Sequence, residues 1–238
     1  MGQIASIPWN GYRVVSTFSG AGGSCLGYRL AGYRVAWANE FVPAAQQTYK
    51  ANHPDSYLDE RDIRAIHPRE ILQAADLELG QIDILDGSPP CVAFSTAGQW
   101  RRDDRKSEPQ KYSDTEQRVD DLFHEFVRLI KGLQPKTFVI ENVAAMVKGR
   151  SKGVFKHVLK LLKSCGYLVE CRILDAQWLG VPQVRKRTIF IGVRSDLNLR
   201  PAYPDPLPYQ YTVRDVLPHI IRENRGGKRH NYQTTNRP

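Results

Sequence analysis

Short apolar runs that alternate with helical stretches constrain the fold of this chain more than any other feature. Runs with the composition of β-strands occupy residues 12–18, 34–40, 82–87, 136–143, 167–176 and 187–194. Stretches of helical composition or periodicity occupy residues 24–33, 43–53, 118–133 and 154–167. Strands that are separated by helices pair in parallel through right-handed crossovers. The sequence therefore predicts an α/β fold, with a doubly wound, mostly parallel sheet and helices on both faces.

Glycine and polar residues follow four of the predicted strands at the point where each strand ends. These stretches read SGAGG, NE, GSPPC and ENV in chain order. In open α/β sheets, ligands bind at the carboxyl ends of the strands. We therefore expect the four stretches to contribute to one shared site.

The overall composition indicates a soluble protein with a polyanionic partner. The chain of 238 residues carries a formal net charge of +9, which favours a partner such as nucleic acid. Its mean hydropathy is −0.46, and no apolar run approaches the ~20 residues of a membrane span. The four cysteines form no CxxC pair and no cluster with zinc spacing, so we expect free thiols, no metal and a cytoplasmic location.

The character of the chain changes after Val193. Residues 200–213 are rich in proline, and residues 222–238 are basic. We therefore predict one domain over residues 1–193 and a connecting segment over residues 194–238.

The turn FSGAGG, residues 18–23, combines with a downstream acid to suggest a nucleoside ligand. Glycines allow a ligand to approach the backbone closely. Glu40 ends the second predicted strand, 18 residues past Gly22, where an acid commonly binds ribose hydroxyls. The spacing is not GxGxxG, because position 25 is Cys, so a nicotinamide dinucleotide is disfavoured. Taken alone, the turn would be better explained by simple chain reversal.

Cys91 is the strongest candidate for a nucleophile. It follows two prolines that stiffen the backbone, and Ser95 and Thr96 place hydroxyl groups after it. Residues 88–117 have few apolar side chains and many charges, which predicts a long mobile loop. Cations in this loop would favour the reactive thiolate; they are Arg101, Arg102, Arg105 and Lys106. The other three cysteines, in predicted helices or strands, are better explained as buried packing residues.

Two later stretches supply an acid and fixed cations. Glu141 ends the strand TFVIENV, at the sheet edge where Cys91 is expected, and could donate a proton or cap the next turn. In GVPQVRKR, residues 180–187, Gln183, Arg185 and Arg187 alternate and would share one face of an extended segment. Guanidinium groups suit carbonyl oxygens and phosphates, although a basic, solvent-facing edge strand would show the same pattern.

Taken in order, the motifs FSGAGG, ANEF, RDI, GSPPCVAFS, ENV and QVRKR resemble those of the C5-cytosine DNA methyltransferases. The match spans about residues 12–193. The resemblance implies a Rossmann-like methyltransferase fold, S-adenosylmethionine as cofactor and DNA as partner. It further implies that Cys91 attacks C6 of a flipped-out cytosine so that C5 can accept a methyl group.

The same resemblance assigns roles to individual residues. Glu141 would hold N3 and the exocyclic amine of cytosine, and Arg187 would hold O2. Contacts with the cofactor are implied for Phe18, Gly20, Ala21, Gly22, Gly23, Glu40, Phe41, Asp62, Ile63, Ser88, Pro90 and Leu122. Contacts with nucleic acid are implied for Ser95, Arg101, Arg102, Arg105, Gln183 and Arg185.

The chain departs from the family pattern at three points. Val92 follows the cysteine where the family usually has Gln, and Ser16-Thr17-Phe18 stands where it usually has Asp-Leu-Phe. The family also continues into a target-recognition domain and a helix with a Gly-Asn motif, neither of which is found here. We therefore expect this chain to be the catalytic large domain, with target recognition supplied by further sequence or by a second polypeptide.

Two other functions stay open at this stage. A tRNA cytosine-C5 methyltransferase would share the motifs, because a branch of the family acts on tRNA. A non-catalytic scaffold with the same fold would keep the architecture and lose the activity.

Overall fold

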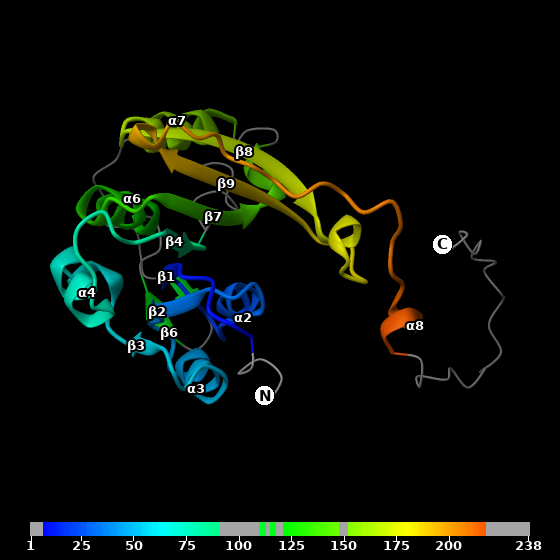
Figure 1. The fold of residues 1–238 in the computed structure, drawn as a ribbon, viewed down its shortest axis with the longest axis horizontal. Helices are drawn as coiled ribbons and strands as arrows, with labels where there is room; N and C mark the ends of the chain where they lie inside the picture. The colour runs from blue at the N-terminus through cyan, green and yellow to red at the C-terminus, as the bar shows by residue number, and fades with distance from the viewer. Residues whose placement is uncertain (1–6, 91–109, 113–114, 118–120, 148–151, 218–238) are drawn as a thin grey trace.

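The structure, a computed structural model, describes residues 7–90, 110–112, 115–117, 121–147 and 152–217. Its centre is a seven-stranded sheet (Figure 1). The strands lie in the order β3 (Tyr57–Asp59), β2 (Arg34–Asn39), β1 (Arg13–Thr17), β4 (Ile84–Gly87), β7 (Thr137–Val143), β9 (Lys186–Arg194) and β8 (Tyr167–Asp175). The predicted fold class, a doubly wound and mostly parallel sheet, is confirmed.

Helices cover both faces of this sheet. One face carries α2 (Gly23–Leu30) and α3 (Pro43–Asn52), and the other carries α4 (Pro68–Ala75), α6 (Leu122–Leu133) and α7 (Lys152–Lys163). Successive strand residues point to opposite faces. Val14 accordingly packs with Cys25 and Tyr49, whereas Val15 packs in the larger cluster that contains Phe126. Burial of these apolar side chains on both faces accounts for the strand runs seen in the sequence.

The strand β9 runs antiparallel to both of its neighbours, β7 and β8. The link from β8 to β9 holds only the short helix η4 (Ala176–Leu179). A connection of this length cannot carry the chain back across the sheet for parallel pairing, which needs about a dozen residues or more. The last two strands are therefore joined as a long hairpin, which extends beyond the body of the sheet in Figure 1.

Several short elements were not predicted from the sequence. They include β3, α4, the 3₁₀ helices η1 (Ile63–Ala65), η2 (Ala144–Val147) and η5 (Ser195–Leu197), and the antiparallel pair of β5 (Gln110–Tyr112) and β6 (Thr115–Gln117). The β5–β6 pair falls inside the predicted loop 88–117, and most of that loop lies outside the described residues.

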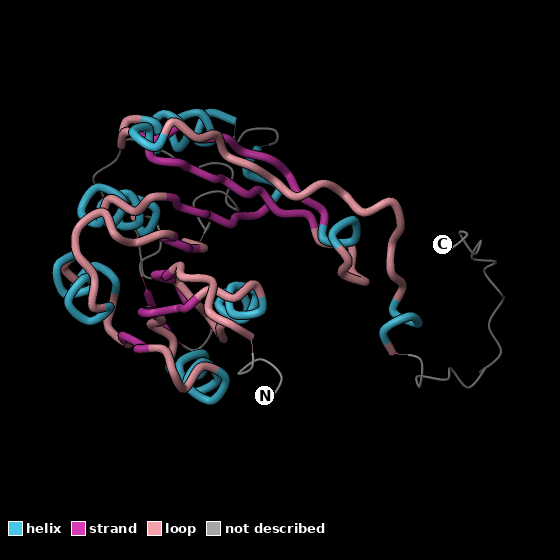
Figure 2. Tube along the Cα trace, in the orientation of Figure 1, coloured by secondary structure: helices cyan, strands magenta, loops and turns pink. Residues whose placement is uncertain are grey.

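The segment after β9 runs back along the β8–β9 hairpin before it reaches α8 (Val213–Val216), as Figure 2 shows. The Tyr203 hydroxyl donates to the carbonyl of Ile189 at 3.1 Å, and the Leu207 amide donates to the carbonyl of Trp178 at 2.7 Å. These contacts attach the proline-rich stretch to the hairpin. None of the helices in the described part of the chain has the length and apolarity of a membrane span.

The order of the strands fixes where a ligand can bind. From β1 the chain builds outward through β2 and β3, then returns to the other side of β1 with β4 and continues to β7. This reversal between β1 and β4 opens a crevice at their carboxyl ends, the usual ligand position in such sheets.

Candidate active site

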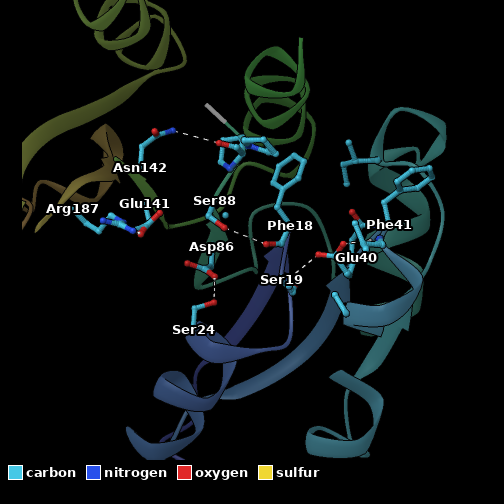
Figure 3. Close-up of a pocket in the computed structure, with 18 of the residues that line it drawn as sticks. Phe18, Ser19, Ser24, Glu40, Phe41, Asp86, Ser88, Glu141, Asn142 and Arg187 are labelled. Atoms are coloured by element: carbon cyan, nitrogen blue, oxygen red, sulfur yellow. Dashed lines mark hydrogen bonds and ion pairs between the residues drawn. The ribbon is translucent and has the colours of Figure 1, made fainter. Parts of the chain in front are cut away.

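A cavity of about 630 Å³ opens at the carboxyl ends of β1, β2, β4 and β7 (Figure 3). This is a suitable volume for a cofactor or a drug-sized ligand. Residues predicted from the sequence that line it are Phe18, Gly20, Glu40, Phe41, Ile63, Ser88, Pro90, Glu141, Arg185 and Arg187. The expected meeting of the four strand ends is therefore found.

The turn after β1 is held in an uncommon backbone conformation. Phe18 has φ of +53°, in the left-handed region that few residues other than glycine adopt. Gly22 has φ of +90°, and a Cβ there would lie 2.2 Å from Nε2 of His53. The Ser88 hydroxyl donates to the Phe18 carbonyl at 3.2 Å and so ties the turn to the end of β4. Such strain concentrates at binding sites, where the surrounding structure must maintain it.

Glu40 fastens the glycine turn to the start of α3. One carboxylate oxygen accepts a hydrogen bond from the Gly20 amide and the other from the Val42 amide, each at 2.7 Å. The residue is 8% exposed. Carboxylate oxygens can each accept a second hydrogen bond. Glu40 can therefore hold the turn and still accept from a hydroxyl in the cavity.

Of the two residues predicted to contact adenine, one lines the cavity and the other lies outside its lining. Ile63 lines the cavity, whereas Asp62 is not among the lining residues. The Asp62 carboxylate accepts from the Arg64 amide and pairs with the Arg64 guanidinium at 2.9 Å. Arg64 also pairs with Asp121, directly before α6. Leu122 is fully buried in the core and does not line the cavity.

Glu141 and two arginines form the opposite end of the cavity. Nε of Arg187 lies 2.8 Å from Oε1 of Glu141, and a terminal nitrogen of Arg185 lies 3.8 Å from the same oxygen. Glu141 in β7 is the register partner of Ile189 in β9. Arg187 lies two residues before Ile189 and therefore on the same face of the sheet as Glu141. Gln183 precedes β9 in a bend, is exposed and does not line the cavity, whereas Arg185 and Arg187 both line it.

Asn142 links β7 to the proline pair. Its amide nitrogen donates to the Pro89 carbonyl at 3.4 Å, and its oxygen accepts from the Val143 amide at 2.8 Å. The proline pair is thereby held beside Glu141. The next residue, Cys91, lies outside the described residues, as do Ser95, Arg101, Arg102 and Arg105.

The sequence did not single out Asp86 or Ser24, and both line the cavity. Asp86 is 7% exposed, and its carboxylate accepts hydrogen bonds from the hydroxyls of Ser24, Ser16 and Tyr28 at 2.8, 3.2 and 3.2 Å. Burial raises the pKa of Asp86 to about 6, and the nearby charge of Glu141 acts in the same direction. An acid at the carboxyl end of a central strand was the only sequence signal for this residue.

The remaining predicted cofactor residues form the turn itself. Ala21, Gly22 and Gly23 lead into α2 and do not line the cavity. Cys25 is fully buried, as predicted for a packing residue, and burial raises the pKa of its thiol. Among the described residues, no three His, Cys, Asp or Glu side chains are grouped so that they could hold a metal ion.

The fold and the site together define a class of protein. A mostly parallel seven-stranded sheet with the order of these strands, and a cavity at its switch point, is a Rossmann-like methyltransferase fold. A prophage-encoded E. coli protein, proposed to be a DNA modification methyltransferase, has the same fold at a TM-score of 0.66 and 28% identity. That similarity covers 87% of this chain and 54% of the other. A Spodoptera frugiperda DNMT2 structure shares the fold at a TM-score of 0.61 and 22% identity, over 84% of this chain and 56% of that one.

Sequence comparison gives the family. The model for C-5 cytosine-specific DNA methylases matches residues 12–237. The type II methyltransferase M.NgoPII of Neisseria gonorrhoeae is 36% identical over 214 residues, which are 88% of this chain and 57% of the relative. M.FnuDI of Fusobacterium nucleatum is 36% identical over 211 residues, which are 88% of this chain and 54% of the relative. The chain belongs to the C-5 cytosine-specific DNA methylase family, and it spans a little over half the length of these relatives.

Proposed function

We propose that this chain carries the catalytic part of a DNA cytosine-5 methyltransferase that uses S-adenosylmethionine. In this proposal, residues 1–193 bind the cofactor and the flipped-out base. Residues 194–238 lead toward target recognition, which further sequence or a second polypeptide supplies. The observation that carries the proposal is the single cavity with a nucleoside-type pocket at one end and the Glu141–Arg187 pair at the other.

The residues at the first end fit an adenosine-containing cofactor. Glu40 keeps acceptor capacity for ribose hydroxyls while it binds two backbone amides. Phe18, Phe41 and Ile63 offer flat or apolar surface for a purine ring. Gly20 has no other heavy atom within 4 Å of the position of a Cβ, so the turn leaves room for a ligand against its backbone. Asp62 lies beside Arg64 and outside the lining, and by the family resemblance it would receive the adenine amino group.

The residues at the second end fit a cytosine ring. Arg187 orients Glu141 through a charge-assisted hydrogen bond, and such bonds are stronger and shorter than neutral ones. A carboxyl group held in this way matches N3 and the exocyclic amine, and a guanidinium group matches O2. Asn142 holds Pro89, and Cys91 follows one residue after Pro90 in the chain.

The chemistry follows from these groups. The Cys91 thiolate forms a bond to C6, and the displaced electrons move toward N3 and O2, where Glu141 and Arg187 stabilise the charge. C5 thereby becomes nucleophilic. The cofactor supplies a methyl group bonded to a positively charged sulfur. The C5–methyl bond would form as the methyl–sulfur bond breaks, and a neutral thioether would be the leaving group. A base then removes the C5 proton, the C6–sulfur bond breaks and the thiolate is restored.

A trapping experiment tests the proposal. The chain is incubated with S-adenosylmethionine and duplex DNA that contains 5-fluorocytosine, in which the C5 proton is absent and the enzyme cannot be released. We expect a covalent protein–DNA adduct with the unmodified chain and none with Cys91→Ser. Cys171→Ser, in β8 away from the cavity, is the matched control and should still form the adduct.

The substrate class is tested in parallel with a tritium-labelled methyl group. Transfer to DNA and not to tRNA supports the proposal. Transfer to tRNA alone would identify the tRNA branch instead, and no transfer or trapping on either nucleic acid would favour a non-catalytic scaffold. The same assays are repeated with the full reading frame of the gene.

A further inference from the structure

Asp86 is a buried carboxylate that the proposed chemistry does not use. It ends β4, where it is the register partner of Ser16 in β1, and it lines the cavity. Its contacts among the described residues are three hydroxyl groups, with Ser16 and Ser24 donating to Oδ2 and Tyr28 to Oδ1. A carboxylate has about four acceptor positions. Oδ1 therefore keeps the capacity to accept one more donor.

A carboxylate in this place carries a cost for folding. Burial raises the pKa of Asp86 to about 6, which means that the folded protein disfavours the charged form. Asn has nearly the same shape and would carry no buried charge at this position. Groups kept in a cavity against their effect on stability are candidates for a binding role.

Asp86 lies where one of the three groups bonded to the sulfur of the proposed cofactor would be placed. The sulfur of S-adenosylmethionine carries three arms: adenosyl, methyl and an amino-acid chain that ends in an ammonium and a carboxylate. Phe18 and Glu40 occupy one side of the cavity and Glu141 with Arg187 the other, and Figure 3 shows Asp86 and Ser24 between them. With the adenosyl arm at Glu40 and the methyl group directed toward the base near Glu141, the third arm lies toward Asp86 and Ser24.

We propose that Asp86 binds the α-ammonium group of the cofactor's amino-acid arm. Ser24 and Tyr28 hold the carboxylate in place for this contact. The inference rests on the proposed function and adds to it the residue that distinguishes an amino-acid-bearing ligand from a plain nucleoside. A cation brought next to a buried carboxylate also offsets the cost of its charge.

A pair of ligands tests this assignment. S-adenosylhomocysteine carries the ammonium, whereas its desamino analogue keeps the carboxylate and the thioether and lacks only the ammonium. Titration calorimetry at pH 8 measures the affinity of each ligand for the unmodified chain, for Asp86→Asn and for Asp83→Asn. Asp83 lies just before β4 and pairs with Lys136, outside the cavity, which makes it the matched control.

We expect Asp86→Asn to lose affinity selectively for the ligand that carries the ammonium group. Hydrogen bonds to charged groups contribute enough for a ~10- to 100-fold effect on affinity. D86N should lower the affinity for S-adenosylhomocysteine by that factor. It should change the affinity for the desamino analogue by less than about threefold. D83N should leave the ratio of the two affinities unchanged.

Three other outcomes would contradict the assignment. An equal loss of affinity for both ligands in D86N would mean that Asp86 acts only through the fold of the cavity. Unchanged affinity for both ligands in D86N would show that Asp86 does not contact the bound ligand. Failure of the unmodified chain to bind both ligands would overturn the proposed function, and this inference with it. Thermal unfolding of D86N at the same pH shows whether the variant is folded.

Discussion

Arg187 and Arg185 both reach Glu141, yet their geometry differs in a way that should separate their roles. Arg187 makes a contact of 2.8 Å with Oε1 and its side chain is 28% exposed, while Arg185 lies at 3.8 Å and is 51% exposed. A close, partly buried guanidinium both orients the carboxylate and stabilises charge on the base. A more exposed one at longer range contributes little.

We therefore expect Arg187→Ala to lower the rate of methyl transfer by about 100-fold or more, comparable to the loss of one oxyanion-hole donor. Arg185→Ala should lower it by less than about tenfold. Initial rates with tritium-labelled S-adenosylmethionine measure both variants, and Lys186→Ala, on the opposite face of β9, serves as the control. Equal losses for the two arginines would show that the distance to Glu141 does not decide the role.

Asp86 makes a second prediction at the residue scale, about stability and pH. Its folded pKa of about 6 lies above the ordinary value of 3.8. The stability that Asp86 contributes is therefore fully present below pH 3.8 and is lost as the pH rises through about 6. The groups that face it are the hydroxyls of Ser16, Ser24 and Tyr28, the thiol of Cys25 and the carboxylate of Glu141.

Asp86→Asn removes the charge and keeps the shape, so it should stabilise the chain above pH 6 and make little difference near pH 4. The difference between the two pKa values corresponds to at most ~3 kcal/mol at pH 8. Urea unfolding of both proteins from pH 4.5 to 8 measures it. A less stable D86N at pH 8 would mean that the hydroxyl network depends on the charged carboxylate.

Asp86 also shows what the sequence could not provide at this scale. Motif positions such as Glu40 and Glu141 stand out because each is an acid at the end of a predicted strand and within a family motif, and both line the cavity. Asp86 ends a strand as well, but its importance depends on hydroxyls from β1 and α2 that are 58 to 70 residues away in the chain. Such contacts arise only once the sheet has formed.

At the scale of elements, the start of α2 depends on Gly22. Its φ of +90° disfavours any other residue, and a Cβ would overlap the His53 ring at 2.2 Å. Gly27, inside the same helix, has open space around its Cβ position and no positive φ. The two glycines therefore form a matched pair in which only the first is required by the backbone.

Gly22→Ala should lower the free energy of unfolding by at least ~2 kcal/mol, from backbone strain and overpacking together. Gly27→Ala should raise it by roughly 0.5–1 kcal/mol, because alanine is the better helix former. Urea denaturation measures both. A neutral Gly22→Ala would show that His53 and the turn can shift without cost, which would also weaken the view of a preformed cavity.

The elements that the sequence predicted were those with a strong period or a long apolar run. The helix α4 was missed although Pro68 begins it and Glu70 completes a capping box with His67, since its eight residues are few for a periodic signal. The strand β3 has three residues, too few for alternation. The antiparallel β9 was predictable in principle, because no helix of crossover length separates it from β8.

At the scale of the whole molecule, charge and extent determine what the chain can do with nucleic acid. The formal net charge of +9 provides a field that attracts phosphates regardless of base sequence. Base reading needs elements that enter a groove and contact base edges. The chain spans a little over half the length of the relatives M.NgoPII and M.FnuDI. In the function proposed above, base reading comes from outside residues 1–193.

Binding of this chain to duplex DNA should therefore be strongly dependent on salt and nearly independent of sequence. Each pair of phosphates contacted corresponds to about a tenfold loss of affinity between 50 and 200 mM salt. Fluorescence anisotropy with several unrelated 20-base-pair duplexes measures the slope and the spread, and affinities should agree within about threefold at each salt concentration. A shallow slope would exclude phosphate contacts as the main source of affinity. A strong preference for one duplex would instead place base-reading groups within these 238 residues, and the exposed Gln183 and Arg185 would be the first to substitute.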